Sequence, residues 1–279
     1  MAVGILTDST AYFAPGEAEA RGVKTVPLYV IFGETTYRDG VDLSIDGFFE
    51  LLTASKELAR TSQPSAGDFQ RAFREMAPTS PEVVAIHLSS HISGTFNTAA
   101  MAAAQTNGDP RIELVDSKTT SVGQTFVVRD AVDAASRGAG LIEVAEIARA
   151  SADKVRTYLA IDTLEYLQRG GRLGRTQAFL GQALDVKPII GLDDEGKIAQ
   201  FARVRTRRKS LDMLVELAGS RGEPRRIAVV DATTPEDAQD VRIRLERTFP
   251  TVPIEVGRAG PVIGVHAGPG MVGIQVQEV

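Results

Sequence analysis

Residues Val83–Asn97 of the 279-residue chain have the sequence VVAIHLSSHISGTFN. Its first part, up to Leu88, is apolar except for His87, which is typical of a strand buried on both faces. A polar loop follows, and Thr95 then opens an Ala-rich segment with the composition of a helix. A buried strand, a polar loop and a helix in this order form one unit of a parallel sheet covered by helices.

The same unit recurs on both sides of this stretch. Several apolar runs end in small polar residues, such as Thr7-Asp8 and Asp116-Ser117. Ligands of parallel sheets bind beyond the carboxyl ends of the strands, so these polar loops are candidates for a binding site. The expected strands are Val3–Leu6, Val26–Ile31, Val83–Leu88 and Ile112–Val115, and the expected helices are Phe48–Ser55, Ala66–Met76, Thr95–Thr106 and Gln124–Ser136.

The pattern changes after about residue 151. Two apolar runs, Lys187–Leu192 and Lys197–Val204, flank the turn signal DDEG, which predicts a β-hairpin and hence an antiparallel sheet. The other expected elements are the helices Leu164–Arg169, Gln177–Leu184, Ser210–Leu217 and Glu236–Arg247 and the strands Tyr158–Ile161, Ile227–Val230, Ile254–Val256, Val262–Val265 and Val272–Val276.

We therefore expect an α/β protein with two domains. Residues 1–153 would form an N-terminal α/β domain with a parallel sheet, and residues 154–279 a C-terminal α+β domain with a largely antiparallel sheet. The length of the chain supports this division, because 279 residues exceed the usual size of one hydrophobic core.

The composition excludes several classes of function. A net charge of -5 argues against a general nucleic-acid-binding protein, and the absence of cysteine excludes thiolate nucleophiles and Cys-based zinc sites. No apolar run is long enough to span a membrane, so we expect no stable membrane insertion. No signal peptide is visible at the start of the sequence, and we expect a cytoplasmic protein.

The common enzymatic motifs are missing or misplaced. Gly268–Gly273 matches G-x-G-x-x-G, but only six residues follow, too few for the helix and acidic residue of a dinucleotide site. The sequence has no Walker A motif, no H-E-x-x-H and no G-x-S-x-G. Of the three histidines, His87 is typical of a core residue, His91 could lie at the surface or in a site, and His266 lies among glycines that allow close approach of a ligand.

Two polar loops have the composition of an anion-binding site. Arg60–Ser65 precedes a helix, and either Ser65 or Gly67-Asp68 is expected near its N-terminal cap. In the quoted stretch, Ser93, Gly94 and Thr95 bring hydroxyls and free backbone N–H groups to a helix start, where the helix dipole favours an anion. Helix capping alone explains many loops of this kind, so the composition leaves both interpretations open.

Seven short blocks together resemble the DegV family. They occur in the family's order from Thr7 to Gly268, so the resemblance covers nearly the whole chain. One block alone is weakly specific, whereas the ordered set is highly specific. The blocks are Thr7–Thr10 (TDST), Thr61–Ser65 (TSQPS), His91–Asn97 (HISGTFN), Val115–Ser117 (VDS), Leu164–Gly174 (LEYLQRGGRLG), Arg205–Lys209 (RTRRK) and Gly260–His266 (GPVIGVH).

The resemblance implies a carrier without enzymatic activity, which holds a long-chain fatty acid between its two domains and needs no other cofactor. In the family a Thr and a Ser that align with Thr61 and Ser93 bind the carboxylate, together with the His that aligns with His266. Family members of the FakB type deliver the fatty acid to a kinase that makes acyl phosphate. The family arginines that resemble Arg172 and Arg205 are linked to contact with that kinase.

We extend the expected ligand site to the neighbouring residues Ser62, Gly94, Thr95 and Gly268. Two departures from the family pattern, Gln168 and Leu173, fall near the expected kinase-contacting surface and leave the carboxylate site unchanged.

The chemistry of these residue types agrees with the resemblance. A buried carboxylate needs several donors, which hydroxyls, an imidazole N–H and helix-start N–H groups supply. The alternative from the residues alone is a serine hydrolase that uses Ser93 and His266, oriented by Asp8 or Asp116. A phosphate-binding domain that uses the same helix start is a third interpretation.

Overall fold

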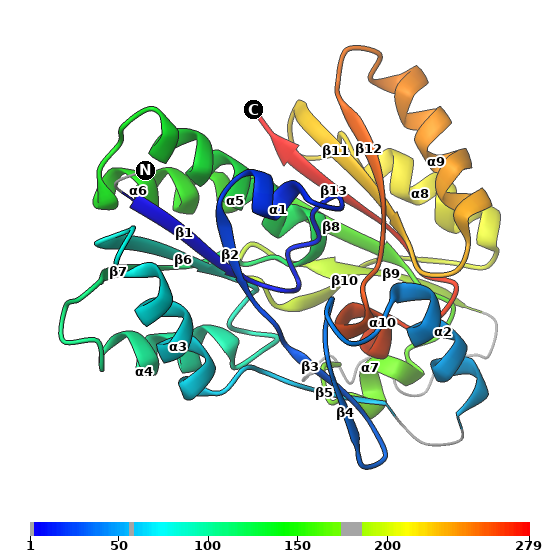
Figure 1. The fold of residues 1–279 in the computed structure, drawn as a ribbon. Coiled ribbons are helices and arrows are strands. Elements are labelled where there is room, and N and C mark those ends of the chain that lie inside the picture. Colours follow the sequence, from blue (N-terminus) through cyan, green and yellow to red (C-terminus); the bar gives the residue numbers. More distant parts are fainter. Residues whose placement is uncertain (1–2, 56–58, 174–185) are drawn as a thin grey trace.

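A computed structural model describes residues 3–55, 59–173 and 186–279 (Figure 1). The first sheet has the strand order β2-β1-β6-β7, and all its neighbouring strands are parallel. This confirms the parallel sheet that the sequence predicts for the first part of the chain. Its strands are β1 (Val3–Asp8), β2 (Val23–Val26), β6 (Glu82–His87) and β7 (Arg111–Asp116).

Helices cover both faces of this sheet. Successive residues of a strand point to opposite faces, and both sets of side chains are apolar here, so each face packs against helices. Ile5 and Val84 pack against α5 and α6, whereas Leu6 and Val83 pack against α3 and α4. A short helix α1 lies between β1 and β2. The bounds of these helices are α1 (Glu17–Ala20), α3 (Ala66–Met76), α4 (Thr95–Ala103), α5 (Ser121–Ser136) and α6 (Leu141–Ala152).

The second sheet has the strand order β10-β9-β8-β13-β11-β12. All pairs are antiparallel except β11 with β12, as the sequence predicts for a largely antiparallel sheet. Helices α8 (Arg207–Leu217) and α9 (Pro235–Thr248) cover one face (Figure 1). The strands are β8 (Val155–Ala160), β9 (Lys187–Leu192), β10 (Ile198–Val204), β11 (Pro224–Asp231), β12 (Ile254–Arg258) and β13 (Val272–Glu278).

Helix α5 lies between the two sheets, and all but three of its sixteen residues are buried. Val127 and Val128 belong to the hydrophobic cluster of the first sheet. Val122 and Phe126 belong to a different cluster, which also contains Ile190 of β9. Burial on nearly all sides is consistent with this central position.

A third, antiparallel sheet with the order β4-β3-β5 was not predicted. It lies beside the helices α2, α7 and α10 (Figure 1). Phe48 and Phe49 of α2 share one hydrophobic cluster with Val262 and Val265 of α10. The bounds are β3 (Tyr29–Phe32), β4 (Thr35–Arg38), β5 (Arg60–Ser62), α2 (Ile45–Ala54), α7 (Glu165–Arg169) and α10 (Pro261–Ala267).

That cluster joins residues from both sides of residue 153, so the domain boundary there stays a prediction. Two expected elements are wrong. Val26–Ile31 is not one strand, because Pro27 lacks a backbone donor and separates β2 from β3. Val262–Val265 is helical rather than extended, because Pro261 occupies the first position of α10, where its fixed φ favours a helix start.

The expected helix Gln177–Leu184 lies outside the described residues. Within the part of the chain that the structure describes, no helix is long and apolar enough to cross a bilayer.

Candidate functional site

A cavity lies where α7, α10, the third sheet and the loop after β6 meet strands β8, β9 and β10. Its volume, measured as the space open to the centre of a water molecule, is about 80 Å³. On the same measure about 10–15 Å³ holds one water, so the cavity has room for a larger ligand. Most of its walls are aliphatic, so it suits an apolar ligand. The aliphatic lining residues are Leu28, Leu88, Ile92, Leu159, Leu167, Ile190, Leu192, Ile198, Val262, Ile263 and Ala267.

Thr61 and His266 form a polar group on the wall of this cavity. Thr61 lies on β5 and His266 near the end of α10, 205 residues apart, yet Thr61 Oγ1 and His266 Nε2 are 2.9 Å apart and hydrogen-bonded. Burial, reinforced by the positive charge of Arg172, lowers the pKa of His266 from 6.5 to about 4. The imidazole is therefore neutral at pH 7 and holds one ring hydrogen.

The loop before α4 brings Ser93 to the same cavity. Ser93 Oγ accepts a hydrogen bond from the backbone N–H of Thr95 at 3.3 Å and lies 2.9 Å from Thr95 Oγ1. Gly94 occupies the cap position of α4. A side chain there would meet Gln63, whose amide donates to the hydroxyl of Thr98 at 2.9 Å. The loop thus holds a hydroxyl at a helix N-terminus, where the helix dipole favours an anion.

Arg172 is a half-buried cation that lines the cavity. Its Nε and Nη1 donate to the backbone oxygens of Ile92 and Gly170, at 3.3 and 2.7 Å. Among the described residues it forms no ion pair with a carboxylate. Burial lowers the pKa of Arg172 from its ordinary value, although an arginine stays protonated at neutral pH. An anionic group in the cavity would supply a counter-charge to Arg172.

The structure brings together five of the residues that the sequence singled out. Thr61, Ser62, Ser93, Arg172 and His266 all line the cavity.

The other four lie outside its lining. Gly94 and Thr95 belong to the start of α4, behind Ser93. Gly268 ends α10 with a φ of 76° and packs against the ring of Tyr166. Arg205 is exposed on the segment between β10 and α8.

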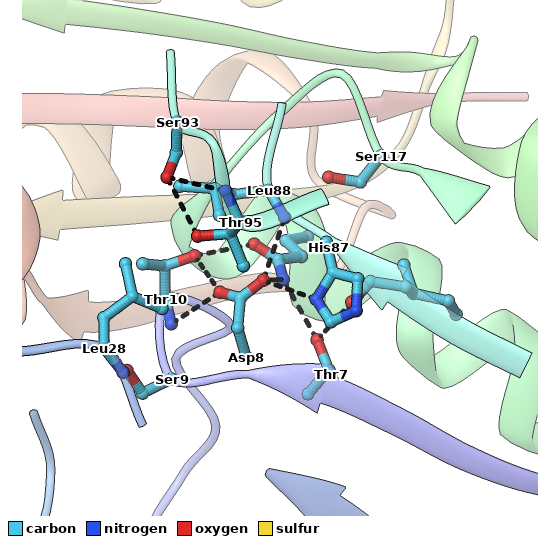
Figure 2. Close-up of polar contacts among 12 residues, drawn as sticks. Thr7, Asp8, Ser9, Thr10, Leu28, His87, Leu88, Ser93, Thr95 and Ser117 are labelled. Atoms are coloured by element: carbon cyan, nitrogen blue, oxygen red, sulfur yellow. Dashed lines mark hydrogen bonds and ion pairs between the residues drawn. The ribbon is translucent and has the colours of Figure 1, made fainter. Parts of the chain in front are cut away.

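A second polar cluster lies next to this site and is fully buried (Figure 2). Asp8 at the end of β1 accepts hydrogen bonds from the backbone N–H of Leu88 at 3.0 Å and from Thr10 Oγ1 at 2.6 Å, and lies 3.0 Å from His87 Nδ1. Burial raises the pKa of Asp8, but the bonds from His87, Thr10 and Leu88 hold it below its usual value. The cluster fixes the start of the loop that leads from Leu88 to Ser93.

This arrangement confirms that His87 is a core residue, and it places His91 at the surface. It also separates the residues of the alternative hydrolase triad. Asp8 contacts His87 rather than His266, and His266 contacts Thr61 rather than Ser93. A catalytic triad requires a serine that contacts a histidine, which in turn contacts an acid. Ser93 and His266 do not form such a triad among the described residues.

Sequence reasoning missed several lining residues. Gln63, Thr120 and Thr157 line the cavity. Gln63 lies inside the quoted block TSQPS but was not singled out, and no motif distinguishes Thr120 and Thr157 from other polar residues. Gly170, which contacts His266, lies inside a quoted block, where the paired glycines were the available signal. Among the described residues, no group of three or more His, Cys, Asp or Glu side chains is placed to hold a metal ion.

Comparisons with known proteins identify the family of the chain. The profile of the DegV family, a family of uncharacterised proteins, matches residues 2–279. Protein DegV of Bacillus subtilis is 36% identical over 278 residues, which cover 98% of each chain. Its crystal structure, described as that of a fatty acid binding protein, has a TM-score of 0.90 over the whole of both chains at 35% identity.

Two further structures are similar over nearly the whole chain. A DegV family protein from Thermus thermophilus, solved to describe its fatty acid binding, has a TM-score of 0.89 at 29% identity and covers 100% of both chains. A stearic acid-binding protein from Eubacterium ventriosum has a TM-score of 0.88 at 26% identity, covering 99% of this chain and 98% of its own. With this match over its whole length, the chain belongs to the DegV family.

Proposed function

We propose that the chain binds one long-chain fatty acid, with its carboxylate at Thr61, Ser93 and His266 and its acyl chain in the aliphatic part of the cavity. The observation that carries this proposal is Arg172, a cation that lines an apolar cavity and forms no ion pair with a carboxylate of the described residues. The similar structures from B. subtilis and T. thermophilus, which are described as fatty acid binding, support it.

The energetics favour a ligand with a charged head and a long apolar chain. Each methylene that leaves water contributes about 0.8 kcal/mol, so a long chain gains on the order of 10 kcal/mol before its ordering cost. The carboxylate loses its hydration on entry, and hydroxyl donors with a nearby guanidinium offset that loss. A small polar metabolite would leave the aliphatic walls without a partner.

Denaturing extraction of the purified protein, followed by mass spectrometry, tests the proposal. We expect one long-chain fatty acid per chain. Oleate should also raise the unfolding temperature more than oleyl alcohol, which has the same acyl chain but no carboxylate. Failure to recover a fatty acid, together with failure to bind added oleate or palmitate, would contradict the proposal.

We further propose that the loaded protein presents the carboxylate to a kinase for acyl-phosphate formation in the cytoplasm, without catalysing the reaction itself. The support is the family resemblance, together with Arg205, which is exposed beside Arg208 and Lys209. A cationic surface would guide an acidic, nucleotide-loaded partner. Arg205→Ala should retain fatty acid and lose most acyl-phosphate formation when a cognate kinase and ATP are supplied. Full turnover by Arg205→Ala would show that this residue is an ordinary surface charge.

A further inference from the structure

The two ring nitrogens of His266 lie in different environments. Nε2 is hydrogen-bonded to Thr61 Oγ1 at 2.9 Å, whereas Nδ1 is buried and contacts no polar partner among the described residues. Nδ1 faces Gly170, where an added Cβ would lie only 2.3 Å away.

Gly170 has a φ of -74°, which any residue can adopt. The contact with His266, rather than the backbone conformation, therefore excludes a side chain at position 170.

The surroundings of Nδ1 select one tautomer of the neutral ring. A hydrogen on Nδ1 would be a buried donor directed at the Cα hydrogens of Gly170, whereas a bare Nδ1 can accept a weak C–H contact from them. Arg172 donates to the carbonyl of the same Gly170 at 2.7 Å, and its charge lowers the pKa of His266. A nearby cation disfavours an additional proton on the ring, so the ring stays neutral and Nδ1 stays bare when Nε2 carries the hydrogen. The ring hydrogen therefore belongs on Nε2.

This tautomer determines what the hydroxyl of Thr61 can do. If Nε2–H donates to Thr61 Oγ1, the oxygen acts as an acceptor in that bond and its own hydrogen stays available. Thr61 lines the cavity, so its hydrogen can be donated to a ligand there.

We propose that Gly170 holds His266 as the Nε2–H tautomer, and that His266 thereby directs the hydroxyl hydrogen of Thr61 to the ligand carboxylate. This inference rests on the proposed fatty acid site and makes His266 a positioning residue that acts through Thr61. The same turn aims Arg172, because the carbonyl of Gly170 accepts from its guanidinium.

Nitrogen-15 NMR of the ligand-free protein tests the tautomer directly. The chain has three histidines, and a His266→Gln variant assigns the signal of His266. We expect Nε2 to carry the hydrogen and Nδ1 to be bare at pH 7. A hydrogen on Nδ1 would overturn the proposal. This measurement needs no ligand, so its result is independent of whether the cavity binds fatty acid.

Binding of oleate to four variants tests the coupling. Gly170→Ala should push the ring away from Thr61 and weaken oleate binding about tenfold, the effect of losing one hydrogen bond to a charged group. It should weaken oleyl alcohol binding much less. The matched control is Gly171→Asn, because an added Cβ there meets nothing within 4 Å and Asn tolerates the φ of 69°. This control should bind oleate like the parent.

In a His266→Ala background, Gly170→Ala should cause no further loss, since the ring that it displaces is gone. If Gly170→Ala weakens oleate binding equally in the parent and in the His266→Ala background, Gly170 acts through the backbone of its turn rather than through His266, and the proposal is contradicted. If Gly170→Ala does not fold, Thr61→Val serves instead. Thr61→Val should weaken oleate binding and shift the Nε2 signal of His266, and an unchanged signal would refute the hydrogen bond on which the inference rests.

Discussion

Replacement of Arg172 by Met should weaken fatty acid binding while preserving the fold. Met keeps most of the aliphatic stem and removes the charge. Arg172 forms no ion pair with a carboxylate of the described residues, so the substitution leaves none of these carboxylates unpaired. Two unit charges about 4 Å apart interact by roughly 4 kcal/mol at an effective dielectric constant of 20 and about 1 kcal/mol in water. Arg172 is half-buried, so a net loss of about 1–2 kcal/mol is expected, which corresponds to a roughly 5- to 30-fold weaker Kd.

Titration with oleate and oleyl alcohol at low and high salt measures this loss. Arg172→Met should weaken oleate binding specifically, and high salt should reduce the difference from the parent only partly, because a half-buried pair is incompletely screened. The matched control is Arg205→Met, which removes an exposed arginine outside the cavity lining. If Arg172→Met binds oleate as tightly as Arg205→Met, Arg172 does not face the carboxylate, and the reasoning from its missing counter-charge is refuted.

Three further predictions follow from the buried polar groups. Thr61→Val and Ser93→Ala should each weaken oleate binding by roughly 1–3 kcal/mol, measured by calorimetry, because each leaves a buried anion short of one donor. Burial raises the pKa of Asp39 to about 7 despite its bond from Ser9, so the folded state binds an extra proton between about pH 4 and pH 7. The contribution of Asp39 to stability should therefore fall as pH rises through this window, and urea unfolding at pH 4–8 should show that Asp39→Asn removes this contribution. The pKa of His266 is lowered to about 4, so the contribution of His266 has the opposite sign: it should fall as pH drops from 6.5 to 4, and His266→Gln should remove it from the same profile.

Much of the fold was predictable because its signals are local. The parallel sheet follows from short apolar runs such as Val83–Leu88, whose successive residues pack against helices on opposite faces. The capping box at Ser65, whose side chain exchanges hydrogen bonds with Asp68, was also visible as a polar residue before a helix. The two wrong strands had local signals as well, since Pro27 interrupts the first and Pro261 immediately before the second favours a helix start.

The candidate site was predictable only through the resemblance to a family. The bond between Thr61 and His266 joins residues 205 positions apart, and no periodicity can indicate which hydroxyl meets which histidine. The role of Arg172 illustrates the same limit. The resemblance links it to a kinase-contacting surface, whereas the structure places it in the lining of the cavity. Its burial depends on how α7 and the turn after it pack, which composition does not specify.

The hydrophobic cluster shared by α2 and α10 has a consequence for how the chain is made. Phe48 and Phe49 leave the ribosome roughly 200 residues before Val262 and Val265, which cover them in the finished protein. At a synthesis rate of about 5–20 residues per second, Val262 and Val265 follow these two rings after on the order of ten to forty seconds. During synthesis the aromatic pair therefore lacks its contacts with α10 for this interval, in which chaperones that bind exposed apolar segments can reach the uncovered side.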